Sequence, residues 1–181
     1  MYFDTIIAGF GGQGVMLMGN LLAYAAMGAG RQVTYMPVYG VEMRGGTANC
    51  TVVISDRPVG SPIVHEPVSA VVMNNPSAEK FGPMVRKTGL LLVNSSLVED
   101  KYVQARASRI LRVPSLELAA EAGNPRLANM VMLGALAQAS GVVGVEHVVE
   151  ALPEALDPRY HKMIPANSAA LRRGAQFALE A

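Results

Sequence analysis

The segment Gly9-Phe10-Gly11-Gly12-Gln13-Gly14 decides the fold that the sequence predicts. It follows the apolar run Thr5-Ile6-Ile7-Ala8, and apolar residues with helical spacing begin at Val15. The order of strand, glycine turn and helix is typical of α/β proteins. Such a turn leaves backbone N–H groups and a helix N-terminus free for an anion, often a phosphate or pyrophosphate. The alternative is a tight turn without a ligand.

Strands and helices alternate along the rest of the chain. Strands are expected at about 2–8, 32–37, 48–55, 70–73, 89–94 and 109–113. Helices are expected at about 15–29, 77–87, 115–122, 125–140, 145–152 and 167–179. Buried strands separated by helices indicate a mostly parallel sheet with helices on both faces. The prediction is one Rossmann-like α/β domain over 1–181 with a helical C-terminal portion.

The composition limits the classes of function. Hydrophobic residues make up 51% of the 181 residues and charged residues 16%, which suggests that a partner covers part of the surface. The net charge of +1 gives no reason to expect nucleic acid or an anionic membrane. No apolar run reaches the roughly 20 residues of a membrane span, and no leader precedes the first strand, so a cytoplasmic protein is expected. The single cysteine, Cys50, is expected to be buried, and one thiol cannot hold a zinc ion or an iron–sulfur cluster by itself.

A dinucleotide site would need more than the glycines. Gly9, Gly11 and Gly14 match the pattern G-x-G-x-x-G. Proteins that bind NAD or FAD through this pattern carry a carboxylate about 20 residues further on, which binds the ribose hydroxyls. Residues 34–38 contain no carboxylate, and Glu42 belongs to the following loop. The sequence therefore argues against NAD and FAD and leaves a loop suited to phosphate.

A second loop follows the second expected strand and reads Glu42-Met43-Arg44-Gly45-Gly46-Thr47. Ligands of open α/β sheets lie at strand ends beside such a glycine turn. Arg44 offers a fork of donors for a carboxylate or phosphate, and Thr47 adds a hydroxyl. Gly45 and Gly46 let the backbone approach a ligand or a neighbouring chain. The alternative is a solvated loop in which Glu42 and Arg44 pair with each other.

Several segments carry a family resemblance. They are the stretch 7–14, the stretch 39–50, Val53-Ile54-Ser55-Asp56, Gly60-Ser61-Pro62 and Asn129-Met130-Val131-Met132-Leu133-Gly134-Ala135. Together they resemble the gamma subunit of 2-oxoacid:ferredoxin oxidoreductases, which include pyruvate enzymes, with the greatest likeness to 2-oxoglutarate and branched-chain members. The resemblance implies a subunit of a complex that oxidatively decarboxylates a 2-oxoacid, expected to be 2-oxoglutarate, to an acyl-coenzyme A and reduces ferredoxin. It also implies that thiamine-binding and ferredoxin-like partner chains hold the thiamine diphosphate, magnesium and iron–sulfur clusters.

The resemblance also suggests a role for the two loops. Coenzyme A carries a pyrophosphate and a ribose phosphate, so it needs anion sites but no ribose-binding carboxylate. The hypothesis is that the glycine turn holds these phosphates, and that the second loop contacts coenzyme A or the thiamine-bearing chain. The candidate residues are Gly9, Gly11, Gly12, Gln13, Gly14, Arg44, Gly45, Gly46 and Thr47, none of them catalytic. The isolated chain is expected to form a homodimer. The alternatives are a stand-alone nucleotide-dependent oxidoreductase and an assembly subunit with a vestigial glycine loop.

Overall fold

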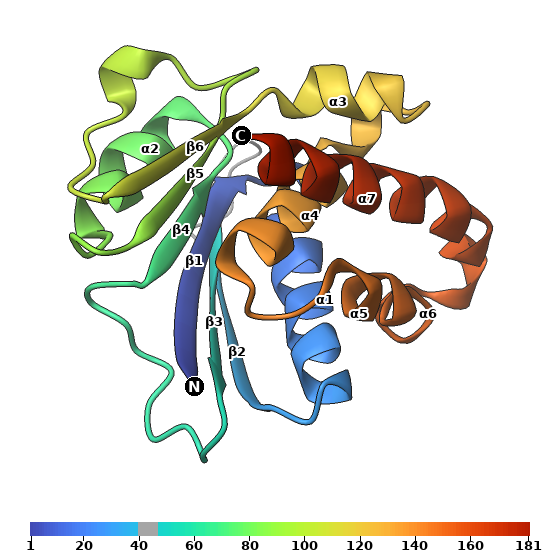
Figure 1. Ribbon diagram of the computed structural model, residues 1–181, viewed down its shortest axis with the longest axis horizontal. Coiled ribbons are helices and arrows are strands. Elements are labelled where there is room, and N and C mark those ends of the chain that lie inside the picture. The colour runs from blue at the N-terminus through green and yellow to red at the C-terminus, as the bar shows by residue number, and fades with distance from the viewer. Residues whose placement is uncertain (40–46) are drawn as a thin grey trace.

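A six-stranded sheet forms the centre of the protein (Figure 1). The structure is a computed structural model that describes residues 1–39 and 47–181. The strand order is β2-β3-β1-β4-β5-β6. The strands are β1 (Tyr2–Phe10), β2 (Gln32–Tyr39), β3 (Thr47–Ser55), β4 (Ser69–Val72), β5 (Leu90–Asn94) and β6 (Arg109–Val113).

The sheet is parallel in one part and antiparallel in the other. β1, β4, β5 and β6 run parallel, which confirms the mostly parallel sheet that the sequence predicts. β3 pairs antiparallel with both β1 and β2. The short connection between β2 and β3 explains this direction, since a parallel pair would need a crossover of a dozen or more residues.

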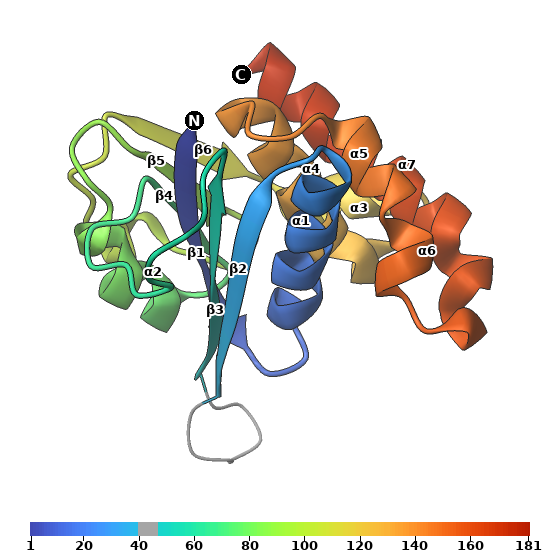
Figure 2. The ribbon, with the colours of Figure 1, turned by 90° about the horizontal axis from the view of Figure 1, so that it is seen from below.

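Helices cover both faces of the sheet, as predicted (Figure 2). The thicker layer contains α1 (Val15–Gly28), α3 (Ser115–Glu121), α4 (Ala128–Ser140), α5 (Val145–Glu150), α6 (Leu152–Ala155) and α7 (Ile164–Glu180). On the opposite face lie α2 (Asn75–Phe81) and a short 3₁₀ turn at 82–84. Other 3₁₀ turns occupy 100–102, 125–127 and 158–163. Two separate apolar clusters, one on each face, form the core.

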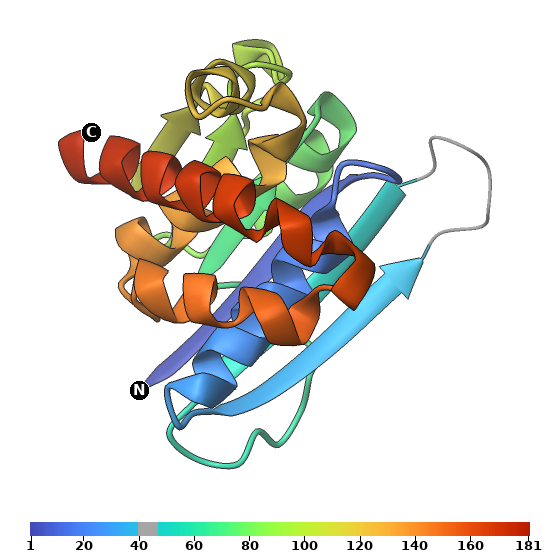
Figure 3. The ribbon, with the colours of Figure 1, turned by 90° about the vertical axis from the view of Figure 1, so that its right-hand side faces the viewer.

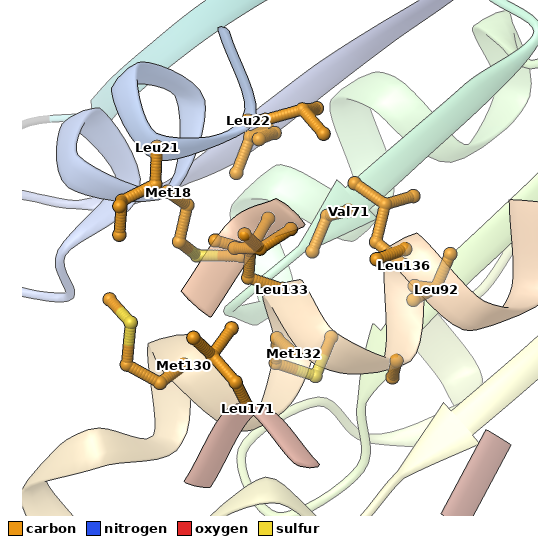
Figure 4. Close-up of a cluster of buried hydrophobic side chains, with 14 of the residues drawn as sticks. Met18, Leu21, Leu22, Val71, Leu92, Met130, Met132, Leu133, Leu136 and Leu171 are labelled. Atoms are coloured by element: carbon orange, nitrogen blue, oxygen red, sulfur yellow. The ribbon is translucent and has the colours of Figure 1, made fainter. Parts of the chain in front are cut away.

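The larger cluster surrounds α4, which is buried from Ala128 to Ala137. Figure 4 shows its side chains between those of α1, the central strands and α7; the labelled residues are Met18, Leu21, Leu22, Val71, Leu92, Met130, Met132, Leu133, Leu136 and Leu171. A helix that is apolar all round must be enclosed by other elements. The methionine-rich stripe of α4 is therefore part of the core.

Some boundaries differ from those that the sequence predicts. Asn74 caps α2, because its side chain accepts a hydrogen bond from the Ser77 N–H at 3.0 Å. The helix expected at 77–87 instead ends at Phe81, since Gly82-Pro83 favours a 3₁₀ turn. α7 begins at Ile164, earlier than expected, because proline at 165 is tolerated in a first helical turn. Among the described residues, no helix combines the length and the apolar character needed to cross a membrane.

Candidate functional site

The glycine turn lies at the carboxyl end of β1, in the middle of the sheet (Figure 3). β1 continues to Phe10, two residues further than expected, and Gly9 pairs there with Ala48 of β3. The turn then closes with a hydrogen bond from the Gln13 N–H to the Phe10 carbonyl at 3.1 Å. α1, which follows the turn, covers one face of the sheet, whereas α2, which follows the neighbouring β4, covers the other. Ligands of open α/β sheets bind at such a switch point.

The first and last glycines of the turn serve packing. A Cβ on Gly9 would lie 2.7 Å from Gln13 Oε1 and 2.9 Å from Val15 Cγ2. A Cβ on Gly14 would lie 2.3 Å from Asn129 Nδ2 on α4. Gly14 also has a left-handed φ of 73° at the start of α1. These two glycines therefore let the turn pack closely against α1 and α4.

The two middle glycines are exposed to solvent. A Cβ on Gly11 or Gly12 would meet no atom within 4 Å, and Gly12 has a φ of 94°. Their N–H groups make no hydrogen bond with any described residue. Gly11 and Gly12 are thus the residues of the turn whose backbone is free to meet an anion.

Gln13 is engaged within the protein. Its Oε1 accepts hydrogen bonds from the Phe10 N–H at 2.7 Å and from Asn74 Nδ2 at 2.9 Å. Its Nε2 donates to the Met73 carbonyl at 3.2 Å. The side chain therefore ties the turn to the end of β4 and the start of α2. Gln13 also lines the cavity described next, and the phosphate contact expected of it stays a prediction.

A cavity of about 450 Å³ opens beside the turn and is called the glycine-turn cavity below. Its lining residues are Gly12, Gln13, Gly14, Met73, Asn94, Leu97, Leu116, Pro125, Arg126, Ala128 and Asn129. Gly14, the N-cap of α1, and Ala128, the first residue of α4, both border it, and helix N-termini carry a partial positive charge. Arg126 is exposed and forms no ion pair with the described residues. Among the described residues that line this cavity there is no carboxylate, so the electrostatics of the described part favour an anion.

Asn94 adds a buried donor to the glycine-turn cavity. Its side chain is 0% exposed, and its Oδ1 accepts a hydrogen bond from Ser115 Oγ at 2.7 Å. Its Nδ2 has no hydrogen-bond partner among the described residues. A buried donor without a partner costs free energy, so a ligand oxygen at this point would be stabilised. Asn94 and Arg126 were missed from the sequence; a polar residue ending a buried strand was the available signal for Asn94.

The second predicted loop is only partly described. Arg44, Gly45 and Gly46 lie outside the described residues, as does the side chain of Thr47. The backbone of Thr47 begins β3 directly opposite Phe10. The antiparallel register therefore brings the start of β3 beside the glycine turn. The ligand contacts expected of Arg44 to Thr47 stay predictions.

Cys50 is buried on β3 as predicted, and its thiol should be unreactive in the folded chain. It is 0% exposed, and burial raises its pKa to about 12. At pH 8 we expect alkylation on the order of a thousandfold slower than in the urea-unfolded chain, because the thiolate is the reacting form. Raising the pH from about 9 toward 12 should speed the reaction. Mass spectrometry after iodoacetamide treatment measures this, and equal rates in both samples would contradict the burial.

The fold and the site define an α/β protein with a glycine turn at the switch point of its sheet. The family model described as pyruvate ferredoxin/flavodoxin oxidoreductase matches residues 4–177. The chain belongs to this family. The family resemblance of its glycine turn, second loop and α4 is thereby confirmed.

Named relatives agree with this assignment. The chain is 42% identical over 177 residues to ketoisovalerate oxidoreductase subunit VorA of Methanothermobacter thermautotrophicus, covering 96% of this chain but 36% of that protein. It thus spans about a third of the length of this relative. It is 36% identical over 158 residues to 2-oxoglutarate synthase subunit KorC of the same organism, covering 84% of each chain. The expectation of 2-oxoglutarate as substrate is not confirmed, because the ketoisovalerate relative has the higher identity.

Solved structures share the fold over the whole chain. The gamma subunit of a keto/oxoacid ferredoxin oxidoreductase from Geobacter sulfurreducens matches with a TM-score of 0.79 and 26% identity, covering 99% of both chains. A 2-oxoglutarate:ferredoxin oxidoreductase from Magnetococcus marinus matches with a TM-score of 0.86 and 20% identity, covering 99% of this chain and 31% of that one. The second likeness shows the fold alone. The first likeness agrees with the resemblance to gamma subunits.

Proposed function

We propose that this chain is the gamma-type part of a 2-oxoacid:ferredoxin oxidoreductase. The complex would oxidatively decarboxylate a 2-oxoacid to an acyl-coenzyme A and pass the electrons to ferredoxin. Support comes from the family membership and from relatives that are named as subunits of such enzymes. A homodimer of the isolated chain stays a prediction.

The chain's own residues do not fit an iron–sulfur cluster, which is held mainly by cysteine thiolates. Its one cysteine is buried, and the Cys50 thiol donates to the Val15 carbonyl at 3.6 Å. Among the described residues, no group of three or more histidines, cysteines and carboxylates is placed to hold a metal ion. As the family resemblance implies, we propose that thiamine-binding and ferredoxin-like partner chains carry the redox and decarboxylation chemistry.

The contribution proposed for this chain is to bind and orient coenzyme A through its phosphates. The observation that carries this is the glycine-turn cavity, which is lined by Gly12 with its free N–H, by Arg126 and by Asn94 with its unpartnered amide. Backbone N–H groups at helix N-termini and arginine forks bind phosphate oxygens. A volume of about 450 Å³ suits the phosphate-bearing part of coenzyme A and leaves its thiol arm to reach a partner chain.

The substrate proposed is a branched-chain 2-oxoacid of the ketoisovalerate type, which the 42% identity to VorA favours over the 36% identity to KorC. We expect the purified complex to use 2-oxoisovalerate with a kcat/KM at least tenfold above those for 2-oxoglutarate and pyruvate. The assay is coenzyme A-dependent reduction of ferredoxin, with identification of the acyl-coenzyme A formed. A preference for 2-oxoglutarate would reverse the substrate proposal. Absence of coenzyme A-dependent reduction with all three acids would overturn the proposed enzyme.

A further inference from the structure

A second cavity, called the basic pocket below, lies at the end of the sheet where the parallel strands begin, whereas the glycine turn lies at the end where they finish. It has a volume of about 300 Å³ and is lined by Glu66, Pro83, Met84, Val85, Arg86, Lys87 and Arg106. Its charged residues come three or four positions before β4, β5 and β6 begin. These strands are parallel, so their N-terminal ends lie at the same end of the sheet. Three cations, Arg86, Lys87 and Arg106, therefore line one pocket together with one carboxylate, that of Glu66.

The cations of the basic pocket are unpaired, unlike most others on the surface. Arg86, Lys87 and Arg106 form no ion pair and no side-chain hydrogen bond with the described residues. Among the described residues elsewhere, the ion pairs of arginine and lysine side chains are Arg31 with Asp56, Lys101 with Glu99, Arg112 with Asp100, Arg159 with Asp157, Arg172 with Glu146 and Arg173 with Glu121. The three cations are exposed and line the same pocket, so their like charges repel one another and a bound anion would reduce that repulsion.

The backbone that carries these cations is fixed in place. The Arg86 N–H donates to the Pro67 carbonyl at 3.1 Å, and the Ser108 N–H donates to the Lys87 carbonyl at 2.7 Å. Val85, the residue before Arg86, is buried, with 1% of its surface exposed. The three segments before β4, β5 and β6 are thus joined to one another. A site whose backbone is already ordered loses less entropy when a ligand binds.

We propose that the basic pocket is an anion site, separate from the glycine-turn cavity, for a compact ligand with at least two negative charges. Arginine forks match carboxylate and phosphate groups, so the ligand class is a small polycarboxylate or phosphate compound. A volume of about 300 Å³ is at the lower end for ligand pockets, which favours a small metabolite over a whole coenzyme. This proposal stands apart from the proposed function, because it concerns other residues at another edge.

The test is an amide NMR titration of the ¹⁵N-labelled full chain with sodium pyrophosphate and, separately, sodium citrate. Sodium chloride at equal ionic strength is the reference. We expect saturable shifts at the amides of Arg86, Lys87 and Ser108 with a Kd below about 1 mM for at least one probe. The double variant Lys87→Gln/Arg106→Gln should weaken binding at least tenfold. The double variant Lys80→Gln/Lys162→Gln removes the same charge from other exposed positions and should bind as the unchanged chain does.

The outcomes separate this site from the glycine-turn cavity. Saturation by pyrophosphate alone assigns the phosphate class, and saturation by citrate alone assigns the polycarboxylate class. Shifts confined to Gly12 and Gly14 would overturn the basic pocket as a site while leaving the coenzyme A proposal standing. Equal weakening by both double variants, or equal shifts with sodium chloride, would also overturn it. If the double variant of the pocket does not fold, Arg106→Gln alone should weaken binding at least threefold, and an unchanged Kd would overturn the proposal.

Discussion

Replacing Gly134 or Gly174 by alanine should lower the free energy of unfolding by about 3 kcal/mol or more, the upper range for overpacked cores. A Cβ on Gly134 would lie 1.9 Å from the Leu171 carbonyl oxygen, and a Cβ on Gly174 would lie 1.9 Å from the Val131 carbonyl oxygen. Both clashes are with backbone, so no side-chain rotation relieves them. The two glycines therefore set how closely α4 and α7 approach each other.

The measurement is urea unfolding followed by circular dichroism. Gly28→Ala is the matched control, because Gly28 is also a helix glycine and a Cβ there would meet no atom within 4 Å. It should leave stability within about 1 kcal/mol of the unchanged chain. Unfolding midpoints of Gly134→Ala and Gly174→Ala equal to that of Gly28→Ala would show that α4 and α7 do not cross this closely.

The contact between α4 and α7 also matters for the candidate site. α4 begins at Ala128, and Ala128 and Asn129 line the glycine-turn cavity while Asn129 packs against Gly14. A substitution that forces α4 and α7 apart would also displace the start of α4, which forms one wall of the glycine-turn cavity. Variants at Gly134 and Gly174 that still fold should therefore lose affinity for coenzyme A as well as stability.

The sequence predicts the parts of this fold that depend on local patterns. The glycine turn, the buried strands and the apolar character of α4 follow from spacing and composition, because each is expressed within a short window. The approach of Gly134 to Leu171 could not be predicted, since the two residues lie far apart along the chain and nothing local marks the contact. The antiparallel direction of β3 was missed for a related reason: strand propensity carries no direction.

The candidate site shows the same division. Gly11 and Gly12 could be found because a glycine pattern between a strand and a helix has a known physical use. Asn94 and Arg126 could not, because only the parallel order of β1, β4 and β5 and the packing of α4 place them beside the turn. Gln13 was assigned a ligand contact from its position in the motif, whereas its hydrogen bonds to Phe10, Met73 and Asn74 are internal.

Gly12→Asp should raise the KM for coenzyme A at least tenfold in the complete oxidoreductase and leave kcat at saturating coenzyme A nearly unchanged. The new carboxylate would stand where the glycine-turn cavity is proposed to hold a phosphate. At about 4 Å two like charges repel by about 4 kcal/mol near a protein surface, and salt reduces this toward the 1.4 kcal/mol that a tenfold change represents. A change confined to KM would indicate that binding, and not the reacting atoms, is affected.

Gly12→Asn is the matched control for this experiment. Aspartate and asparagine have nearly the same size and both tolerate positive φ better than other residues, so the strain at a φ of 94° is similar in the two variants. The difference between them isolates the charge. We expect Gly12→Asn to raise the KM for coenzyme A no more than about threefold, and both variants to keep the KM for the 2-oxoacid. Equal KM values for coenzyme A in the two variants would contradict phosphate binding at the glycine turn. That result would leave the proposed enzyme activity of the complex standing.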